Sequence, residues 1–301
     1  MSSDTMAVSP GVPDLVTSIK ESKCVLFVGS AIHAPPPADS KYTYAEEERP
    51  PLGSGLAKML AEECGYRQKL PDDPPTDLQR VSLCFETDPN LRRSALVDRL
   101  DKYLRQGKKP SAAVRMLASL PFTIIVTTNY DQLLESALIE SEKKKRPVVT
   151  VYNPTSGKRA DDPYNDPTIE RPLLFKMHGD LDHRESIVIT DEDYIGFVQR
   201  MSESRQSYPV PDTVLYHMTK WPILFVGYSL RDYNLRLLFR TLRCQIDPVN
   251  MKPTYSVDRS PDPLILKVWQ DNKQWVTFLV EDLWTFLPWL FKAVHGREFE
   301  P

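Results

Sequence analysis

The chain has 301 residues, of which 41% are hydrophobic and 26% are charged. This composition excludes a wholly disordered protein and allows a large buried core. The 38 basic and 41 acidic side chains give a net charge of -3, so we expect no direct sequence-specific binding of nucleic acid. The four cysteines form no CxxC pair, and neither a signal segment nor an apolar run of about 18 residues is present, so we expect a cytoplasmic protein with no metal and no membrane span.

The first part of the sequence predicts one strand and then a series of helices. An apolar run at 23–28 ends at Gly29, as expected of a buried strand that meets a tight turn. A proline-rich loop follows at 34–51. Helices are expected at 13–22, 52–64, 77–86, 90–104 and 111–120, with Asp77, Asn90 and Ser111 as caps. We therefore expect a loop and helical insertion at about 34–120 within a single domain of 1–301.

From residue 123 onward, strands and helices alternate. Strands are expected at 123–127, 148–151, 173–176, 187–189, 223–226, 254–257 and 276–279. Helices are expected at 130–141, 190–201, 232–243, 264–270 and 283–294, and Thr190 with Asp193 forms a capping-box pattern. This alternation predicts an α/β fold, with a Rossmann-type parallel sheet that carries helices on both faces.

Four polar motifs each follow a predicted strand. They are VGSAIH at 28–33, TTNYD at 127–131, MHGD at 177–180 and VGYSLRD at 226–232. Ligands of open α/β sheets bind beyond the carboxyl ends of the strands. Small residues there let backbone N–H groups approach a phosphate. The four motifs are therefore expected to converge on one site.

Each motif also has a purely structural explanation. Gly29 is compatible with the simple end of a strand, and Asn129 with a helix N-cap. His178 is compatible with a hydrogen-bonded core histidine, and 227–229 with a turn whose serine caps the next helix. We favour the shared site because all four motifs occur together and in order.

The order of the motifs resembles the sirtuin-like fold, which has a glycine-rich first turn, a (T/Q)-N-x-D motif, a His-Gly motif and a late G-x-S turn. TTNYD at 127–131, IVITDEDY at 187–194 and FVGYS at 225–229 resemble the bacterial branch, whose members hydrolyse NAD in antiphage defence. The resemblance spans roughly residues 23–280. It implies an NAD-binding Rossmann-type sheet with a helical second lobe.

Two departures from the family pattern matter. Sirtuin deacylases carry a four-cysteine zinc ribbon, and this sequence has no such spacing, so a protein deacylase is only the second reading. The first turn is usually G-A-G-x-S, but here Ala31 takes the place of the last glycine and His33 that of the serine. Ala31 adds a methyl group near the expected pyrophosphate. His33 either contacts the nicotinamide ribose or a phosphate, or points outward.

The resemblance implies an NAD glycohydrolase that releases nicotinamide and ADP-ribose. His178 is expected to act as the base, and Asn129 to hold the attacking water or the ribose hydroxyls. The residues expected to bind NAD are Gly29, Ser30, Ala31, His33, Thr128, Asp131, Gly227, Tyr228, Ser229 and Asp232. Asp232 has helix capping as a competing role. A third reading is a non-catalytic module that senses NAD or ADP-ribose.

An uncontrolled NAD hydrolase would kill its host, and the catalytic domain nearly fills this sequence. We therefore expect control by homo-oligomerisation or by a partner chain, for which the resemblance implies a DNA-translocase ATPase or an Argonaute-like protein. A late aromatic segment is either a docking face or ordinary core, and its helical spacing favours core. Its residues are Trp269, Trp275, Trp284, Phe286, Trp289 and Phe291.

Overall fold

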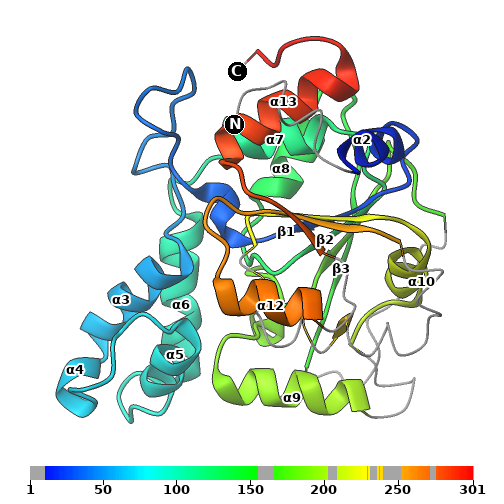
Figure 1. Ribbon diagram of the computed structural model, residues 1–301. Helices are drawn as coiled ribbons and strands as arrows, with labels where there is room; N and C mark the ends of the chain where they lie inside the picture. Colours follow the sequence, from blue (N-terminus) through cyan, green and yellow to red (C-terminus); the bar gives the residue numbers. More distant parts are fainter. Residues whose placement is uncertain are drawn as a thin grey trace.

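The computed structural model describes residues 11–154, 166–202, 209–228, 230, 236, 238–239, 252–271 and 276–300. Within them, seven strands form one parallel sheet in the order β3-β4-β2-β1-β5-β6-β7 (Figure 1). The strands are β1 (Val25–Val28), β2 (Ile124–Thr127), β3 (Val148–Val151), β4 (Leu173–Lys176), β5 (Ile223–Val226), β6 (Thr254–Val257) and β7 (Val276–Leu279). The predicted Rossmann-type α/β fold is confirmed.

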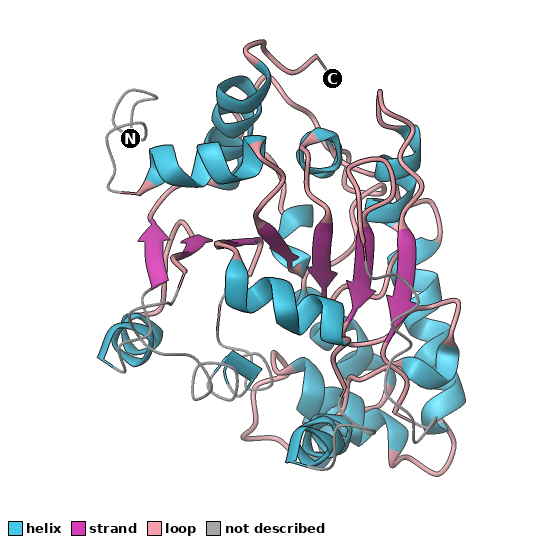
Figure 2. Ribbon diagram, turned by 90° about the vertical axis from the view of Figure 1, so that its right-hand side faces the viewer, coloured by secondary structure: helices cyan, strands magenta, loops and turns pink. Residues whose placement is uncertain are grey.

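Helices cover both faces of the sheet, because its central strands are apolar on both sides. In β1, Leu26 and Val28 pack into one hydrophobic cluster, while Val25 and Phe27 pack into the other. The first face carries α2 (Val12–Lys20), α7 (Ala112–Ser119), α8 (Leu133–Glu140) and α13 (Leu283–His295). The second carries α9 (Asp191–Ser202), α10 (Asp212–Lys220) and α12 (Pro263–Asp271), and Figure 2 shows the two layers with the sheet between them.

A helical lobe is inserted between β1 and β2 and stands beside the sheet in Figure 1. It consists of α3 (Gly53–Glu63), α4 (Tyr66–Lys69), α5 (Leu78–Glu86) and α6 (Arg92–Arg105). The lobe packs around a third hydrophobic cluster, which it shares with Tyr130, Leu181, Ile187 and Ile189 of the sheet domain. Arg93 of α6 lies 2.8 Å from Asp193 of α9 and so ties the lobe to the sheet domain.

The helix starts test the predicted caps. Asp77 and Ser111 accept hydrogen bonds from backbone N–H groups three residues later, as expected. The prediction of Asn90 as a cap is wrong, because α6 begins at Arg92 and the Asn90 N–H itself donates to Asp88. Thr190 and Asp193 bond reciprocally, which confirms the capping box.

The expected strand at 187–189 is wrong. The side chains of this segment are buried between two clusters, with Ile187 and Ile189 in the cluster of the lobe and Val188 in that of the second sheet face. Its backbone groups bond to residues outside any ladder. The Val188 N–H donates to the His178 carbonyl at 2.9 Å, and Tyr130 Oη donates to the Val188 carbonyl at 2.8 Å. Asp193 accepts the N–H groups of Ile189 and Thr190.

Several elements differ from the sequence-based expectation. The short helices α4, α10, η1 (Ser30–His33) and η2 (Arg184–Ser186) were not expected. The helix expected at 130–141 begins only at Leu133. Most of the helix expected at 232–243 lies outside the described residues.

The late aromatic segment belongs to the core. Four of its side chains are buried, namely Trp269, Trp284, Phe286 and Phe291. Trp289, which lies on α13, is partly buried and packs against the cluster that α13 joins. Trp275 lies outside the described residues. The described side chains of this set therefore contribute to the core rather than to a docking face. Among the described helices, none combines the length and apolar character needed to cross a bilayer.

Candidate functional site

A cavity of about 1050 Å³ lies at the carboxyl ends of the strands, between the sheet and the helical lobe. Its size is at the upper end of typical ligand sites, roughly 300–1,000 Å³. All four predicted motifs line it. They contribute Gly29, Ser30, His33, Thr128, Asn129, Tyr130, Asp131, His178, Gly227 and Tyr228. The cavity lies where the strand order reverses around β1, the usual ligand position in this class of fold.

Two of the motifs interlock through their glycines. The Gly29 N–H donates to the Val226 carbonyl at 3.0 Å, and the Ala31 N–H donates to the Gly227 carbonyl at 3.1 Å. A Cβ on Gly29 would overlap the Gly227 carbonyl, and one on Gly227 would overlap the Ile32 amide. Gly227 also has φ of +68°, which disfavours other residues. The turns after β1 and β5 therefore form one rigid floor.

Asn129 and His178 are brought to one cavity by strand register. Thr127 at the end of β2 pairs with Lys176 at the end of β4. Each of the two functional side chains comes two residues after its strand end, so both enter the same cavity. Asn129 is not an N-cap, because α8 begins after Gln132. This geometry supports the expected convergence of the two motifs on one site.

His178 is buried, with 2% of its surface exposed, but it faces the cavity. Its Nδ1 lies 3.3 Å from Tyr194 Oη, and the Tyr194 ring packs edge-on with a centroid distance of 5.0 Å. When Nδ1–H donates to Tyr194, Nε2 is the nitrogen able to accept a proton. The contact with Tyr194 on α9 thus sets which ring nitrogen of His178 carries the proton. The sequence alone did not predict this role of Tyr194.

His33 is turned inward and does not point to solvent. Its Nε2 lies 3.4 Å from Asp131 Oδ2 and 3.5 Å from Asn129 Nδ2, and it is 4% exposed. Burial raises the pKa of the Asp131 carboxyl, but His33 and Lys176 outweigh burial and the net pKa is lowered. Asp131 also accepts the Leu133 N–H at 3.0 Å. The carboxylate is therefore ionised and holds both His33 and the start of α8.

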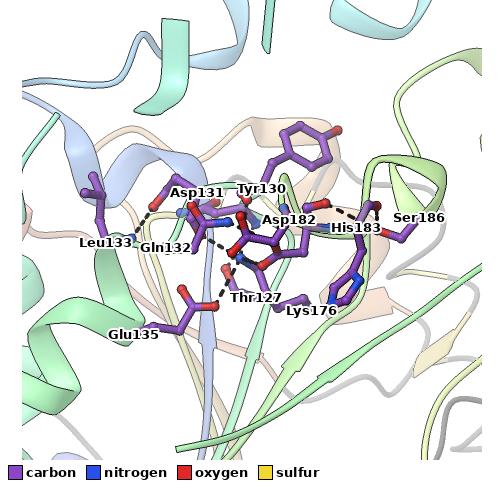
Figure 3. Close-up of polar contacts among 12 residues, drawn as sticks. Thr127, Tyr130, Asp131, Gln132, Leu133, Glu135, Lys176, Asp182, His183 and Ser186 are labelled. Carbon is purple, nitrogen blue, oxygen red and sulfur yellow. Dashed lines mark hydrogen bonds and ion pairs between the residues drawn. The ribbon is translucent and has the colours of Figure 1, made fainter. Parts of the chain in front are cut away.

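Lys176 was not expected at the site, yet it joins the loops that follow β2 and β4 (Figure 3). This fully buried lysine donates to the Asp131 carbonyl at 2.6 Å and pairs with Asp180, which follows His178 and Gly179. Its Nζ also lies 3.3 Å from Glu135 Oε1. The only signal in the sequence is a lysine that ends an otherwise apolar strand.

The remaining predicted residues fall into three groups. Thr128 and Tyr228 line the cavity, as does the exposed Ser30. Ala31 is exposed and is absent from the cavity wall, with its N–H already bonded to Gly227. Ser229 and Asp232 lie outside the described residues.

Charged groups are sparse around the cavity. Its described wall contains no lysine or arginine. No group of three or more His, Cys, Asp or Glu side chains able to hold a metal ion occurs in the described ranges. A bound dinucleotide would thus rely on backbone N–H groups and neutral side chains in this part of the site.

Comparison with known proteins agrees with this architecture. The curated relatives include the NAD(+) hydrolase ThsA of Acinetobacter baumannii (strain 532279), 25% identical over 246 residues, which are 81% of this chain and 44% of the relative. ThsA of Enterococcus faecium is 28% identical over 185 residues, which are 61% of this chain and 35% of the relative. Defense-associated sirtuin 2 of Bacillus subtilis is 27% identical over 194 residues, 61% and 17% of the respective lengths. The chain thus spans less than half the length of each of these relatives.

The SIR2-like domain family matches residues 123–277, just over half of the sequence. The match contains Asn129, Lys176 and His178 and begins after the Gly29 turn. It confirms the resemblance to sirtuins that the order of the motifs indicated. The chain therefore belongs to the SIR2-like domain family.

Proposed function

We propose that this chain is an NAD glycohydrolase that cleaves NAD into nicotinamide and ADP-ribose. The placement of Asn129 and His178, two residues beyond the paired ends of β2 and β4 and in one cavity, carries the proposal. The names of the ThsA relatives, which are NAD(+) hydrolases, support it. By the same reasoning, and from the name of the relative in Bacillus subtilis, we propose a role in antiphage defence.

In the proposed reaction, water attacks C1′ of the nicotinamide ribose as the glycosidic bond breaks. The bonding electrons return to the pyridine ring, so nicotinamide leaves as a neutral molecule. The transition state resembles an oxocarbenium ion. Asn129 holds the water or the ribose hydroxyls, because its amide both donates and accepts. His178 takes the proton that the water releases, with Tyr194 holding the required tautomer.

For the rest of NAD, we assign the pyrophosphate to the floor made by Gly29, Ser30 and Gly227. Thr128, Tyr228 and the His33–Asp131 pair face the ribose and nicotinamide. The expected contact of Ala31 with the pyrophosphate is not supported, since its N–H is already bonded to the Gly227 carbonyl and its side chain is exposed. Ser229 and Asp232 keep the NAD-binding role expected from the sequence, with helix capping as the competing role of Asp232.

The test is to incubate purified protein with NAD and to quantify nicotinamide and ADP-ribose by chromatography. His178→Ala and Asn129→Ala are each expected to lower kcat by about 10²–10⁴-fold, the usual range for loss of a general base or an equally placed group. His295→Ala, an exposed histidine on α13 away from the cavity wall, serves as the control. A His178→Ala protein that consumes NAD at the parental rate would refute the assignment of the base.

The same assay separates the alternatives. O-acetyl-ADP-ribose formed from an acetylated peptide would indicate a deacylase. NAD binding in calorimetry without turnover would indicate a sensing module.

We further infer that the chain forms one catalytic domain with an inserted lobe and that it works in the cytoplasm. The thiols of Cys24, Cys64 and Cys84, which are free in the described structure, support this location. We also propose control by self-assembly or by a partner such as a DNA-translocase ATPase or an Argonaute-like protein. Size-exclusion chromatography that shows only monomer, alone and with the products of adjacent genes, would contradict such control.

A further inference from the structure

A second, much smaller cavity lies behind the Asn129 loop. It has about 10 Å³ of space for the centre of a water molecule. About 10–15 Å³ of such space is enough for one bound water. Its wall combines apolar side chains, such as Val28 and Val114, with the polar residues His33, Asn129 and Glu135. A space of this size and polarity fits a single water and excludes any larger ligand.

Three residues that line this space each carry a buried polar atom without a hydrogen-bond partner in the described structure. His33 Nδ1, Asn129 Oδ1 and Glu135 Oε2 have no hydrogen-bond partner among the described residues, and none of the three is exposed to solvent. His33 and Asn129 also line the main cavity, which is open. Because these two atoms are inaccessible, we place them on the side of the small cavity. Buried polar groups in folded proteins are almost always hydrogen-bonded, so the three atoms point to a bound ligand.

The donors and acceptors can be counted. Asp131 is ionised and can only accept, so His33 Nε2 carries the proton that faces it. In the arrangement proposed below, His33 Nδ1 carries no proton and accepts a hydrogen bond, as does Asn129 Oδ1. An ionised Glu135 would be a third acceptor, but a water molecule has only two hydrogens to donate. All three atoms have a hydrogen-bond partner if Glu135 is protonated and donates to the water.

The surroundings of Glu135 favour its protonated form. Burial raises the pKa of this carboxyl to about 7, although Lys176 opposes the shift. Asp180 and Asp131 add to the rise, because their charges repel a further carboxylate. His33 is the remaining titratable group across the small cavity.

We propose that one water molecule binds in this cavity, accepts a hydrogen bond from Glu135 and donates to His33 Nδ1 and Asn129 Oδ1. Glu135 is then a positioning residue, which acts through the water to hold the Asn129 amide with Nδ2 on the side of the main cavity. This effect on turnover rests on the proposed NAD hydrolysis. The water site itself is independent of that activity.

The kinetic test compares the pH dependence of NAD hydrolysis in three proteins. The parental protein is expected to lose kcat above about pH 7, as Glu135 ionises and the donor is lost. Glu135→Gln keeps a permanent N–H donor, so its kcat should stay near the parental value at pH 6 and should not show this alkaline loss. Glu135→Leu should lower kcat by up to about 100-fold at every pH with KM unchanged, as expected when a reacting group is misplaced.

The control is Glu140→Gln, an exposed carboxyl on the same helix, which should keep the parental pH profile. The proposal is overturned if Glu135→Leu is as active as the parent. It is also overturned if Glu135→Gln keeps the alkaline loss, which would assign that loss to another titratable group.

A structural measurement keeps the proposal testable even if Glu135→Leu does not fold. A high-resolution crystal structure of the parental protein should show one water within hydrogen-bond distance of all three atoms. A cavity without that density would refute the water site. If the water is present but the parental protein does not consume NAD, only the proposed function fails.

Discussion

The sheet edge and the helical lobe face each other across the cavity, but they are held by different forces. At the sheet edge, glycine turns touch backbone to backbone, and Lys176 sits fully buried among carboxylates. In the lobe, an apolar cluster is accompanied by ion pairs at the surface, such as Lys69 with Asp88 at 2.6 Å. The side chains of the proposed active site are thus held by close backbone contacts and a buried lysine, which tolerate few substitutions. The lobe on the opposite side of the cavity is held by apolar contacts and surface ion pairs, which tolerate more.

The largest expected effect is that of Lys176→Met. It would leave the buried Asp180 carboxylate without its cation, and breaking a buried ion pair from one side costs about 3–5 kcal/mol. The free energy of unfolding, measured by urea denaturation, should fall by that amount.

Lys145→Met is the matched control, because Lys145 is equally buried but donates to the Leu120 carbonyl, and burial lowers its pKa to about 8. Its expected loss is smaller, about 1 kcal/mol, the usual net value of one hydrogen bond. Equal losses in the two variants would show that the carboxylates around Lys176 are not what makes it important.

Gly227→Ala is expected to have the next largest effect. The added Cβ would overlap the Ile32 amide at a positive φ, and backbone strain of this kind costs about 1–3 kcal/mol. Both unfolding free energy and NAD affinity should fall, since the shared floor must shift. Gly196→Ala, in α9 with nothing within 4 Å of the new Cβ, should instead raise stability by up to about 1 kcal/mol. Equal changes in the free energy of unfolding of the two variants would contradict the special role of the Gly227 turn.

Arg99→Ala in the lobe should have the smallest effect. Arg99 pairs with Glu63 at the surface, and such pairs are screened by salt. Its urea midpoint should match that of the parent at 0.15 M salt and fall only at low salt. A clear loss at 0.15 M salt would mean that the lobe depends on charge as strongly as the sheet edge does.

The sheet was predictable because each strand is a compact apolar run, as VLFV in β1 and ILFV in β5 show. The strand expected at 187–189 failed for a physical reason. The same apolar pattern serves a segment that packs between the lobe and the second sheet face, with side chains and one carbonyl in place of a strand partner. Periodicity along the chain does not distinguish these two environments.

The cavity was predictable as a location, since parallel strands bring the motifs after them to one edge. The buried residues that hold the loops of the cavity in place were not predictable. Lys176 reads as the end of a strand and Glu135 as an ordinary helix residue, and only their burial together reveals their role. The inward turn of His33 depends on Asp131, which lies 98 positions later in the chain.

The placement of the lobe between β1 and β2 has an evolutionary and practical implication. The lobe enters and leaves the sheet domain between β1 and α7, so a different helical insertion can be grafted there without changing the strand order. If the proposed function holds, a graft that keeps the apolar contacts with Tyr130 and Ile187 should change which molecules enter the cavity and leave Asn129 and His178 in place.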